Sequence, residues 1–593
     1  MARSQCFSFL NPKFVSRLSS VIVAVLMFLF TLPVWRVAYA QQSIPNDPQG
    51  GCPVAANTFA GWFETGTPAA NGIVKPADSV NFPNLPNCSF YEWSKQMFLW
   101  LTSPAPSRYG GGTRIFNSPT FYDVSPPDAN GFRTLSQHKP GLLKFFRVRA
   151  AKPGPDGLPV VFDRRGRMFE VEKPKLGPTG KPIVLNRLNH PVEVGQVRVE
   201  NNKAVFLDKT GKPIRAAKPQ MRKQPAVTIQ RRRRPTQKTA QAPIAQRFII
   251  DRRAIFFDLA GNVIDTEEGQ AGTDAVLMSQ NHSLAYFATM VNDVYAYFLT
   301  GNKDGMFNPA FTQFPVSASD LGKITSFASA HSKTFPDPNA LTVEVKTAWV
   351  EASGLPNASE FITLRATVPT YDTSNPANWA PNGQKTTTLA LVSIHVVGST
   401  AGHPEMIWAT FEHLGSTPSA AYSYNSTTAG GVKSVAQDTS GTWLFSTSNS
   451  AGPFNCERMN EDASGHIVAF AANGNCPPAP AMVGPSDTLR QNPFGKAGTD
   501  ANSNTEVIAI NSTTLIPGND LRNSYFLSGA TWTIGGAPPS SQNQVGTNIL
   551  ANSALETYTQ AANCFSCHSG SNMLGTSSGN GLSHIYGPLK SLF

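Results

Sequence analysis

The apolar residues of the stretch 271–450 follow the pattern of β-strands. LTVEVKTAWV places Leu341, Val343, Val345 and Thr347 on one face, whereas TLALVSIHVVG is apolar on both faces. A strand that is apolar on both faces belongs in the middle of a sheet, because both of its faces are then covered. Clusters of Pro, Gly, Ser and Thr separate these runs. The pattern predicts a mainly β body, sandwich-like or two-layered, with a few helices.

Two other stretches predict helices. In SFYEWSKQMFLWLTSP, residues Phe90, Trp93, Met97 and Leu101 recur at spacings of three and four and would line one helix face. Such an aromatic stripe indicates core packing in preference to contact with a bound cofactor. The apolar stretch AVLMSQNHSLAYFATMVNDVYAYFL also predicts a helix.

A repeated pattern in the stretch 139–270 predicts β-hairpins. The strings VVFDRRGRMF, AVFLDKTGKPI and AIFFDLAGNVI each place an apolar run before Asp, two further residues, Gly and a second apolar run. Asp opens such a turn by bonding nearby backbone groups, and Gly supplies a positive φ. A related cue occurs in GPTGKPIVL, and the uneven spacing indicates a meander of hairpins and not a solenoid. The shared turns fall at Asp163/Gly166, Asp208/Gly211 and Asp258/Gly261.

Charge is distributed unevenly along the 593 residues. The net charge is +11, but the stretch Lys139–Arg253 alone holds 28 Lys and Arg against 8 Asp and Glu. Its densest part, Arg231–Arg234, lies among Pro, Gln and Thr, where like charges without apolar partners indicate a solvated, flexible loop. The alternative is an electrostatic docking site for an acidic partner protein, an anionic surface or a polyanion. No aromatic residues interleave the arginines, so nucleic acid is not expected as a partner.

The N-terminus has the features of an export signal. Arg3, Lys13 and Arg17 precede the apolar stretch VIVAVLMFLFTLPVW, and the small-x-small tripeptide Ala38–Ala40 follows it. This order predicts cleavage near Gln41 and a periplasmic mature protein. An uncleaved membrane anchor is the alternative, although the stretch is short for a full span. No later segment is apolar enough to cross a bilayer, so no transmembrane span is expected in the mature chain.

The most specific chemical motif is the C-x-x-C-H run at 564–568, close to the C-terminus. In such a run the two thiols form thioethers to one edge of a porphyrin, and the histidine is carried beneath the iron. The motif predicts one covalent haem c, with Cys564 and Cys567 as anchors and His568 as the proximal iron ligand. Attachment of this kind takes place outside the cytoplasm in bacteria, in agreement with the signal.

Four cysteines remain for disulfides once Cys6 leaves with the signal and the motif cysteines are used. An even remainder in an oxidising compartment predicts two disulfides with three possible connectivities. Pairing of nearest neighbours, Cys52 with Cys88 and Cys456 with Cys476, is preferred. Free buried thiols are the alternative.

Three histidines, His395, His403 and His413, lie in a short stretch together with Glu405 and Glu412. Three histidines can bind a metal ion. Their spacings of 8 and 10 have no defined ligand geometry, however, and no cysteine accompanies them. We therefore expect His395 to be a hydrogen-bonded core residue, and we assign no catalytic pair to the two glutamates.

Several short motifs together resemble a group of poorly characterised bacterial c-type haem proteins. They are WSKQMFLWLTSPA near the mature N-terminus, KTAW in mid-chain, IHVVGS followed by IWATFEH, and the C-terminal C-x-x-C-H region. The resemblance spans much of the mature chain. It implies a periplasmic monohaem c-type cytochrome and no particular reaction. The usual form of that group lacks the arginine-rich insertion.

The sixth iron ligand has several candidates. Only 25 residues follow His568, which is too few to cover a haem, so the preceding body should supply one wall, with NSYFLSGATWTI as the leading candidate. His584, the only histidine beyond the motif, ranks first as the distal ligand, and an exposed surface histidine is its alternative role. Next in this ranking come a vacant or water-filled site, then a methionine of the body such as Met406 or Met482, and last Met573.

The motifs and charge divide the chain into five segments. They are a signal peptide at 1–40, a loop-rich N-terminal segment with one amphipathic helix at 41–138, a basic β-hairpin region with the Arg-rich loop at 139–270, a β-rich core domain at 271–500, and a haem-attachment region at 501–593 whose short helical part begins at a capping box formed by Ser553 and Glu556.

These features predict a periplasmic c-type cytochrome that transfers single electrons, with the basic segment 139–253 facing an acidic redox partner. One alternative is a haem-dependent oxidoreductase acting on an unidentified small substrate. Another is a haem-based ligand-binding or sensory module. No flavin or nicotinamide fingerprint and no nucleophile elbow is found, so no catalytic residue is assigned. Bis-histidine ligation would favour electron transfer, whereas an open iron site would permit ligand binding or peroxide chemistry.

Overall fold

The computed structural model separates two compact units, Met1–Ala38 and Tyr39–Phe593. The boundary lies two residues before the predicted cleavage site, and the cleavage itself stays a prediction. The structure describes residues 39–83, 87–125, 133–140, 143–144, 149–150, 160–163, 168–172, 174–200, 203–215, 218–219, 244–250, 253–258, 260–264, 266–267, 275–447, 450, 452–461, 465–469, 482–495, 500–539, 543–550, 552–558, 560, 564–568, 582–583, 585–587 and 589–593.

The helices within these ranges are short to medium in length. None of them combines the length and the hydrophobicity that a membrane-spanning helix requires. The α-helices are α2 (Ala56–Trp62), α3 (Cys88–Leu101), α4 (Asp293–Lys303), α5 (Ala318–Ala330), α6 (Ala501–Thr513) and α7 (Cys564–Cys567).

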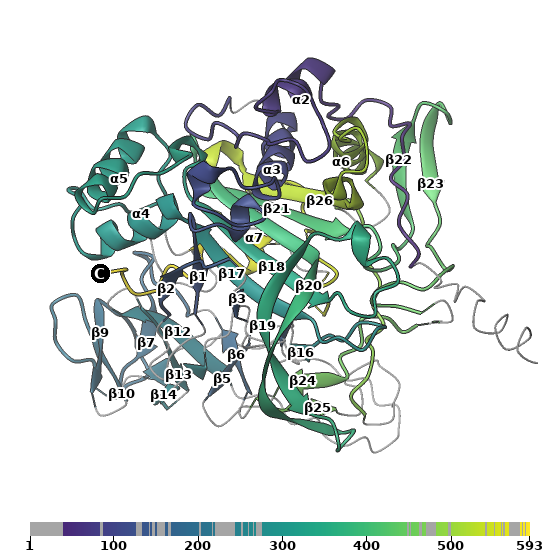
Figure 1. Ribbon diagram of the computed structural model, residues 1–593. Coiled ribbons are helices and arrows are strands. Elements are labelled where there is room, and N and C mark those ends of the chain that lie inside the picture. The colour runs from purple at the N-terminus through teal and green to yellow at the C-terminus, as the bar shows by residue number, and fades with distance from the viewer. Residues whose placement is uncertain are drawn as a thin grey trace, which may run out of the picture. The chain divides into compact units, whose positions relative to one another are not determined.

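A 14-stranded sheet forms the centre of the second unit (Figure 1). Its middle consists of five strands, each antiparallel to its neighbours: β17 (Tyr286–Asn292), β18 (Val343–Glu351), β20 (Asn378–Thr400), β21 (His403–His413) and β26 (Tyr525–Thr533). The two apolar runs predicted as strands are β18 and the inner part of β20. The prediction of a mainly β body with a few helices is therefore confirmed. The other strands of this sheet are β1 (Phe121–Val124), β2 (Leu135–Gln137), β3 (Leu143–Lys144), β4 (Arg149–Ala150), β16 (Ala275–Val276), β19 (Thr363–Asp372), β24 (Met459–Glu461), β25 (Ile467–Ala469) and β27 (Gln544–Gly546).

The pairing register places different side chains on the two faces of the middle strands. Val345 lies opposite Val396, and both are buried in the main hydrophobic core. The next residue, Lys346, lies opposite His395, which in turn lies opposite Thr410 of β21. Because successive strand residues point to opposite faces, Lys346, His395 and Thr410 share the second face. We call this second face the C-terminal face, because the C-terminal segment packs on it.

Helices α3 and α6 pack against β26 on the core face (Figure 1). The helix predicted from the aromatic stripe is α3, but it is buried on nearly all sides and not on one. Phe98 stacks on Phe411 of β21 with ring centroids 4.3 Å apart, and Phe90 stacks on Trp532 of β26 at 4.1 Å. These contacts confirm a core role for the stripe. The sequence did not predict α2.

The prediction of a helix at AVLMSQNHSLAYFATMVNDVYAYFL is wrong for the first part of this stretch, which includes the strand β17. The residues of β17 pair with β1 on one side and β18 on the other. Helix α4 begins only at Asp293, where the side chain of Asn292 accepts a hydrogen bond from the backbone N–H of Tyr295. A short apolar run fits a buried strand as well as a helix, so periodicity could not separate them.

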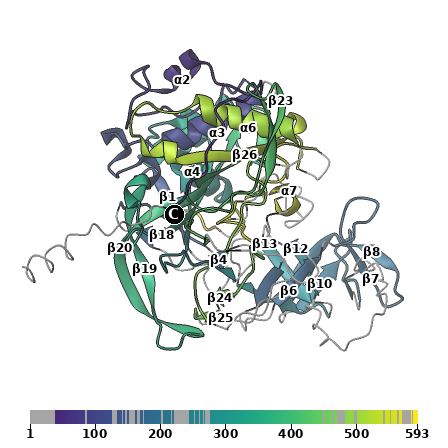
Figure 2. The ribbon, with the colours of Figure 1, turned by 90° about the vertical axis from the view of Figure 1, so that its right-hand side faces the viewer.

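The stretch 139–270 forms hairpins, as predicted (Figure 2). Asp208 accepts hydrogen bonds from two backbone N–H groups of its turn at 2.8 and 3.0 Å, and Gly211 has a φ of 80°. Asp258 accepts two equivalent bonds at 2.9 Å. Gly166 and Arg231–Arg234 lie outside the described residues. The strands here are β5 (Val160–Asp163), β6 (Met168–Glu172), β7 (Ile183–Leu185), β8 (Pro191–Glu193), β9 (Gln196–Glu200), β10 (Lys203–Leu207), β11 (Lys218–Pro219), β12 (Ile244–Ile250), β13 (Arg253–Asp258), β14 (Val263–Ile264) and β15 (Thr266–Glu267).

Cysteine pairing follows the prediction where it is described. Cys52 and Cys88 form a disulfide that joins the N-terminal segment to the first residue of α3. Cys456 is also disulfide-bonded. Its expected partner, Cys476, lies outside the described residues, so that pairing stays a prediction.

A buried ion pair ties distant parts of the chain to β21. The side chains of Arg490 and Glu412 have no exposed surface, and Arg490 Nε and Nη2 donate to Glu412 Oε2 at 3.0 and 2.8 Å. Arg490 Nη1 also donates to Oε1 of Gln42 at 2.6 Å. Glu412 Oε1 accepts from the backbone N–H of Ser553 at 3.0 Å. One ion pair thus anchors both the start of the second unit and the segment that precedes the C-x-x-C-H motif.

The substitution Glu412→Gln should lower the free energy of unfolding by about 3–5 kcal/mol, because it leaves the Arg490 charge buried without its counter-ion. Urea denaturation measures this loss. The matched control is Lys385→Met, which breaks a 2.7 Å ion pair with Glu351 whose lysine is 48% exposed, and which should cost about 0–1 kcal/mol. Equal losses in the two variants would contradict the role given to the buried pair.

His413 is a buried residue of the core. Its ring stacks on Phe361 with centroids 3.7 Å apart. Nδ1 accepts from the backbone N–H of Gly415 at 3.0 Å, and Nε2 donates to the carbonyl of Glu360 at 3.3 Å. Burial lowers the pKa of His413 to about 3, the charge of Arg490 acts in the same direction, and the Glu360 carbonyl opposes it. His413 is therefore neutral in the folded protein at neutral pH.

This lowered pKa predicts a loss of stability in acid. Between the unfolded pKa of about 6.5 and the folded value near 3, only the unfolded chain binds a proton at His413, so its contribution to stability falls as the pH falls. From about pH 7 to about pH 5 the loss due to His413 should be about 2 kcal/mol. Urea denaturation of the wild type and His413→Gln at both pH values measures it, and a difference that does not change with pH would refute it.

Candidate functional site

The C-x-x-C-H motif forms the single helical turn α7, and His568 follows it directly. The backbone N–H of His568 donates to the carbonyl of Cys564 at 2.8 Å, which continues the helical hydrogen bonding by one residue. Positions three and four apart share one face of a helix. The backbone therefore places Cys564, Cys567 and His568 on one face, as attachment of a single flat group requires.

The imidazole of His568 is held in a defined orientation. Its Nδ1 lies 2.9 Å from the carbonyl oxygen of Leu582, which can only accept, so the ring proton is on Nδ1. This tautomer carries its lone pair on Nε2. Metal-binding histidines have the same arrangement when their other ring nitrogen donates a hydrogen bond to a carbonyl or carboxylate oxygen. Burial lowers the pKa of His568 to about 4, although the Leu582 carbonyl acts in the opposite direction. A neutral imidazole is the form that binds metal.

Apolar residues of the body form the surface on which the motif packs. The ring of Trp408 of β21 lies 4.2 Å from that of His568 and 6.3 Å from that of Phe565, which is fully buried. Trp408 is fixed by a hydrogen bond from its Nε1 to the carbonyl of Glu405 at 2.9 Å. The body thus covers one side of the motif through β21. The aromatic side chain of Trp532 in β26, the expected wall, instead stacks with α3 on the core face.

The segment before the motif forms turns at 552–558, in place of the predicted helix. Asn552 and not Ser553 caps it: the Asn552 side-chain oxygen accepts from two following backbone N–H groups. Glu556 reaches back to the backbone N–H of Asn552 at 3.0 Å, so the reciprocal bonding of a capping box is present one position earlier than expected. The hydroxyl of Ser553 donates to Glu412 instead.

Glu556 contacts two side chains of the C-terminal face, His395 and Lys346. Nε2 of His395 lies 2.9 and 3.0 Å from the two carboxylate oxygens, and Nζ of Lys346 lies 3.7 Å from one of them. Although burial alone raises the pKa of Glu556, His395, Lys346 and the Asn552 N–H outweigh it and lower the pKa to about 2. His395 is hydrogen-bonded, as expected, but with 18% of its side chain exposed it faces the C-terminal segment and not the core.

A second contact fixes the segment that follows the motif. The hydroxyl of Ser583 donates to Glu344 of β18 at 2.6 Å and lies 2.9 Å from the hydroxyl of Tyr295 in α4. Burial raises the pKa of Glu344 to about 7, and the Ser583 hydrogen bond acts against this shift. Ser583 follows Leu582, the acceptor for His568. The carbonyl that orients the imidazole is thus fixed to the sheet.

These residues fit the attachment of a c-type haem. The motif presents two cysteine positions and a neutral histidine on one helix face, beside the apolar rings of Trp408 and Phe565. Lys346, His395 and Glu556 remain 18–22% exposed although β18 and β20 are central strands of a large sheet.

The expected distal ligands are only partly placed. His584 and Met573 lie outside the described residues. Met406 is fully buried in the same apolar cluster as Phe565, whereas Met482 is 57% exposed. Met406 is therefore the better placed of the two methionines of the body.

The three histidines of β20 and β21 do not converge. His403 is buried and its Nδ1 lies 2.7 Å from Glu405 Oε1, His413 lies in the core beside Phe361, and His395 lies at Glu556. Within the described ranges, no group of three or more His, Cys, Asp or Glu side chains could hold a metal ion.

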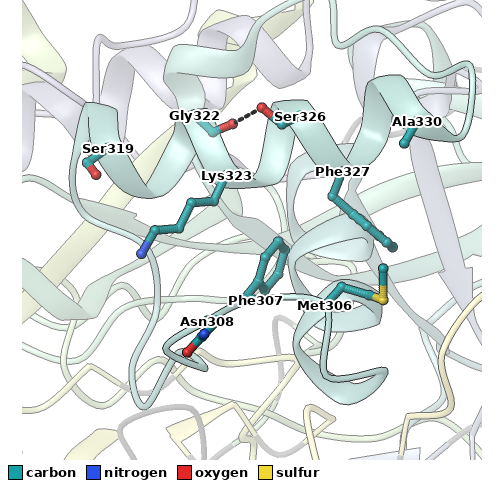
Figure 3. Close-up of a pocket in the computed structure, with 9 residues that line it drawn as sticks. All are labelled: Met306, Phe307, Asn308, Ser319, Gly322, Lys323, Ser326, Phe327 and Ala330. Carbon is teal, nitrogen blue, oxygen red and sulfur yellow. Dashed lines mark hydrogen bonds between the residues drawn. The ribbon is translucent and has the colours of Figure 1, made fainter.

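A surface hollow between α5 and the loop after α4 takes no part in this site (Figure 3). Phe307 and Phe327 both line it and pack edge to face, with ring centroids 5.8 Å apart. The lysine Lys323 is the one titratable side chain among the described residues that line it. The hollow therefore lacks the acid, base and ligand groups that the C-terminal face provides.

Sequence reasoning missed two residues of the site, Trp408 and Lys346, and it did not predict that His395 would contact Glu556. Trp408 was part of the IWATFEH motif, and Lys346 of KTAW, without a role in either case. Both lie two residues from other members of the face along their strands, so the alternation of strand side chains would have grouped Lys346 with Glu344. That Lys346 lies opposite His395 follows from the strand register, which the sequence alone does not give.

Comparison with protein-family models, with curated proteins and with solved structures finds no match for this chain. The assignment of the site therefore rests on the motif and its geometry.

Proposed function

We propose that this protein is a periplasmic c-type cytochrome that carries one covalent haem and transfers single electrons. The observation that carries the proposal is a hydrogen bond of His568, the residue directly after the second motif cysteine. Its Nδ1 donates to the carbonyl of Leu582. A helical turn with two cysteines does not by itself require the next histidine to be held in one orientation. A histidine that presents Nε2 to an iron atom does require a partner that fixes its ring in this way.

The residues of the chain have separate roles in this proposal. Cys564 and Cys567 would carry the thioethers, and His568 would bind the iron. A bound haem supplies one-electron redox chemistry at its iron. Leu582 keeps the imidazole in one tautomer, and Trp408 and Phe565 exclude water from one side of the site. No proton acceptor or nucleophile is needed for electron transfer.

The compartment follows from two features of the chain. The N-terminal sequence has the order of an export signal. The Cys52–Cys88 disulfide is of the kind that persists in an oxidising compartment. Both support maturation in the periplasm, where haem is attached to C-x-x-C-H motifs.

Expression with periplasmic haem maturation should give one haem per chain, detected by intact mass and by a pyridine haemochrome spectrum. The double substitution Cys564→Ala/Cys567→Ala should abolish covalent attachment, because no thiol remains for a thioether. His568→Ala should retain a thioether-bound haem but lose the axial imidazole signature. His190→Ala, which changes an exposed histidine of the hairpin region, is the control and should leave both signals unchanged. A wild-type mass equal to the bare polypeptide would rule out the proposal.

The basic hairpin region supplies the surface for a partner protein. Eight of its described Lys and Arg side chains are exposed, and the excess of positive charge within 139–253 favours an acidic redox protein. Long-range attraction of this kind speeds association more than it strengthens the final contact. The exposed residues are Lys139, Lys181, Arg187, Arg198, Lys203, Lys209, Lys212 and Arg215.

Removing charge from this region should weaken binding to an acidic probe. Poly-glutamate immobilised on a sensor should bind Lys209→Ala/Lys212→Ala more weakly than wild type at low salt, and the difference should vanish at high salt because of screening. Lys385→Ala/Lys433→Ala removes the same charge from exposed positions outside the region. An equal loss in both double variants would show that only net charge matters, against a specific docking surface.

A further inference from the structure

Two separate segments of the C-terminal region meet on one strand of the sheet. Glu556, from the segment before the motif, contacts Lys346 of β18 at 3.7 Å. Ser583, from the segment after the motif, bonds Glu344 of the same strand. Glu344 and Lys346 are two residues apart and therefore on one face. Lys346 thus lies beside both segments that hold His568.

His395 is the third residue of this cluster. It lies directly opposite Lys346 in the strand register, and its Nε2 lies within hydrogen-bond distance of both carboxylate oxygens of Glu556. The three side chains are 18–22% exposed, which is enough for a polar environment but too little for full solvation. Charges held in such a position are screened much less than charges on the surface.

The strand register brings the Lys346–Glu556 pair close to His568. His395 lies opposite Thr410 of β21, and Trp408, two residues from Thr410 on the same face, has its ring 4.2 Å from that of His568. The two charges are therefore near the position of the proposed proximal ligand. Their field would reach an iron atom bound to that ring.

We propose that Lys346 and Glu556 form a pair of opposing charges that sets the reduction potential of the iron bound by His568. The proposal rests on the proposed function. Lys346 favours the reduced state, Glu556 favours the oxidised state, and His395 holds Glu556 in place without binding the iron. All three are positioning residues and not catalytic ones.

The sign follows from the charge change at the iron. Reduction moves one electron from the redox partner to ferric iron and lowers the positive charge of the site by one. A nearby cation repels the more positive ferric state, so it raises the reduction potential. A nearby anion stabilises that state and lowers the potential. The two charges oppose each other, and removal of either one exposes the effect of the other.

Potentiometric titration of the purified holoprotein tests this directly. Lys346→Met should lower the ferrous-to-ferric ratio at a fixed ambient potential about tenfold, which equals about 59 mV for one electron. Glu556→Gln should raise the ratio by a similar factor. Lys346→Arg keeps the charge and should restore the wild-type potential. Lys385→Met removes an equal charge from the outer part of β20 and should leave the potential unchanged.

Different outcomes separate this inference from the proposed function. If wild type carries haem but Lys346→Met and Glu556→Gln shift the potential in the same direction, or not at all, the opposing-charge pair is overturned while the cytochrome assignment stands. If His395→Gln alters the axial-ligand spectrum, His395 binds the iron and the role given to it here is wrong. A wild type without haem would instead overturn the proposed function. Equal haem content in all variants, measured as pyridine haemochrome, shows that each has matured normally.

Discussion

The antiparallel register of β18, β20 and β21 is the constraint on which the site depends. It sets Val345 opposite Val396 on the core face, and Lys346 opposite His395 on the C-terminal face. A shift of one residue would exchange the two faces of the shifted strand and turn a polar side chain such as Lys346 toward the aromatic residues of α3. The hydrophobic core therefore fixes the register, and the register presents Lys346, His395 and Trp408 to the C-terminal segment.

The C-terminal segment is held to that face at points on both sides of the motif. Upstream, Glu556 binds Lys346 and His395, and Ser553 binds Glu412. Downstream, Ser583 binds Glu344, which positions the carbonyl that receives His568. A single helical turn such as α7 is not stable alone, since nucleation costs more than one hydrogen bond returns. The surrounding polar contacts supply the order that α7 cannot provide for itself.

The same contacts connect structure and the proposed redox role. Polar groups inside a protein are retained when they are hydrogen-bonded or paired, and the Lys346–Glu556–His395 cluster meets that condition. An apolar cluster at this place would hold the segment as well, but under the proposed function it would leave an iron bound by His568 without a local field. Charged groups at this partly buried site both hold the C-terminal segment on the sheet and set the local electrostatic potential. The basic hairpin region contributes charge of a different kind, on exposed residues suited to attracting a partner.

The sequence by itself determined the features that depend on local spacing. The C-x-x-C-H run, the strands with apolar residues on both faces, and the Asp and Gly turns at Asp208 and Asp258 all follow from short patterns. For the cysteines the sequence only favoured Cys52–Cys88 among three possible connectivities, and the structure decided it. The sequence did not determine whether the residues of β17 form helix or strand, because strand pairing with β1 and β18 overrides an ambiguous apolar run. Nor could it bring Glu556 to Lys346, Ser583 to Glu344 or Trp408 to His568. Those contacts join residues 160 or more positions apart, and only the packed sheet, with its register fixed by the core, decides which of them meet.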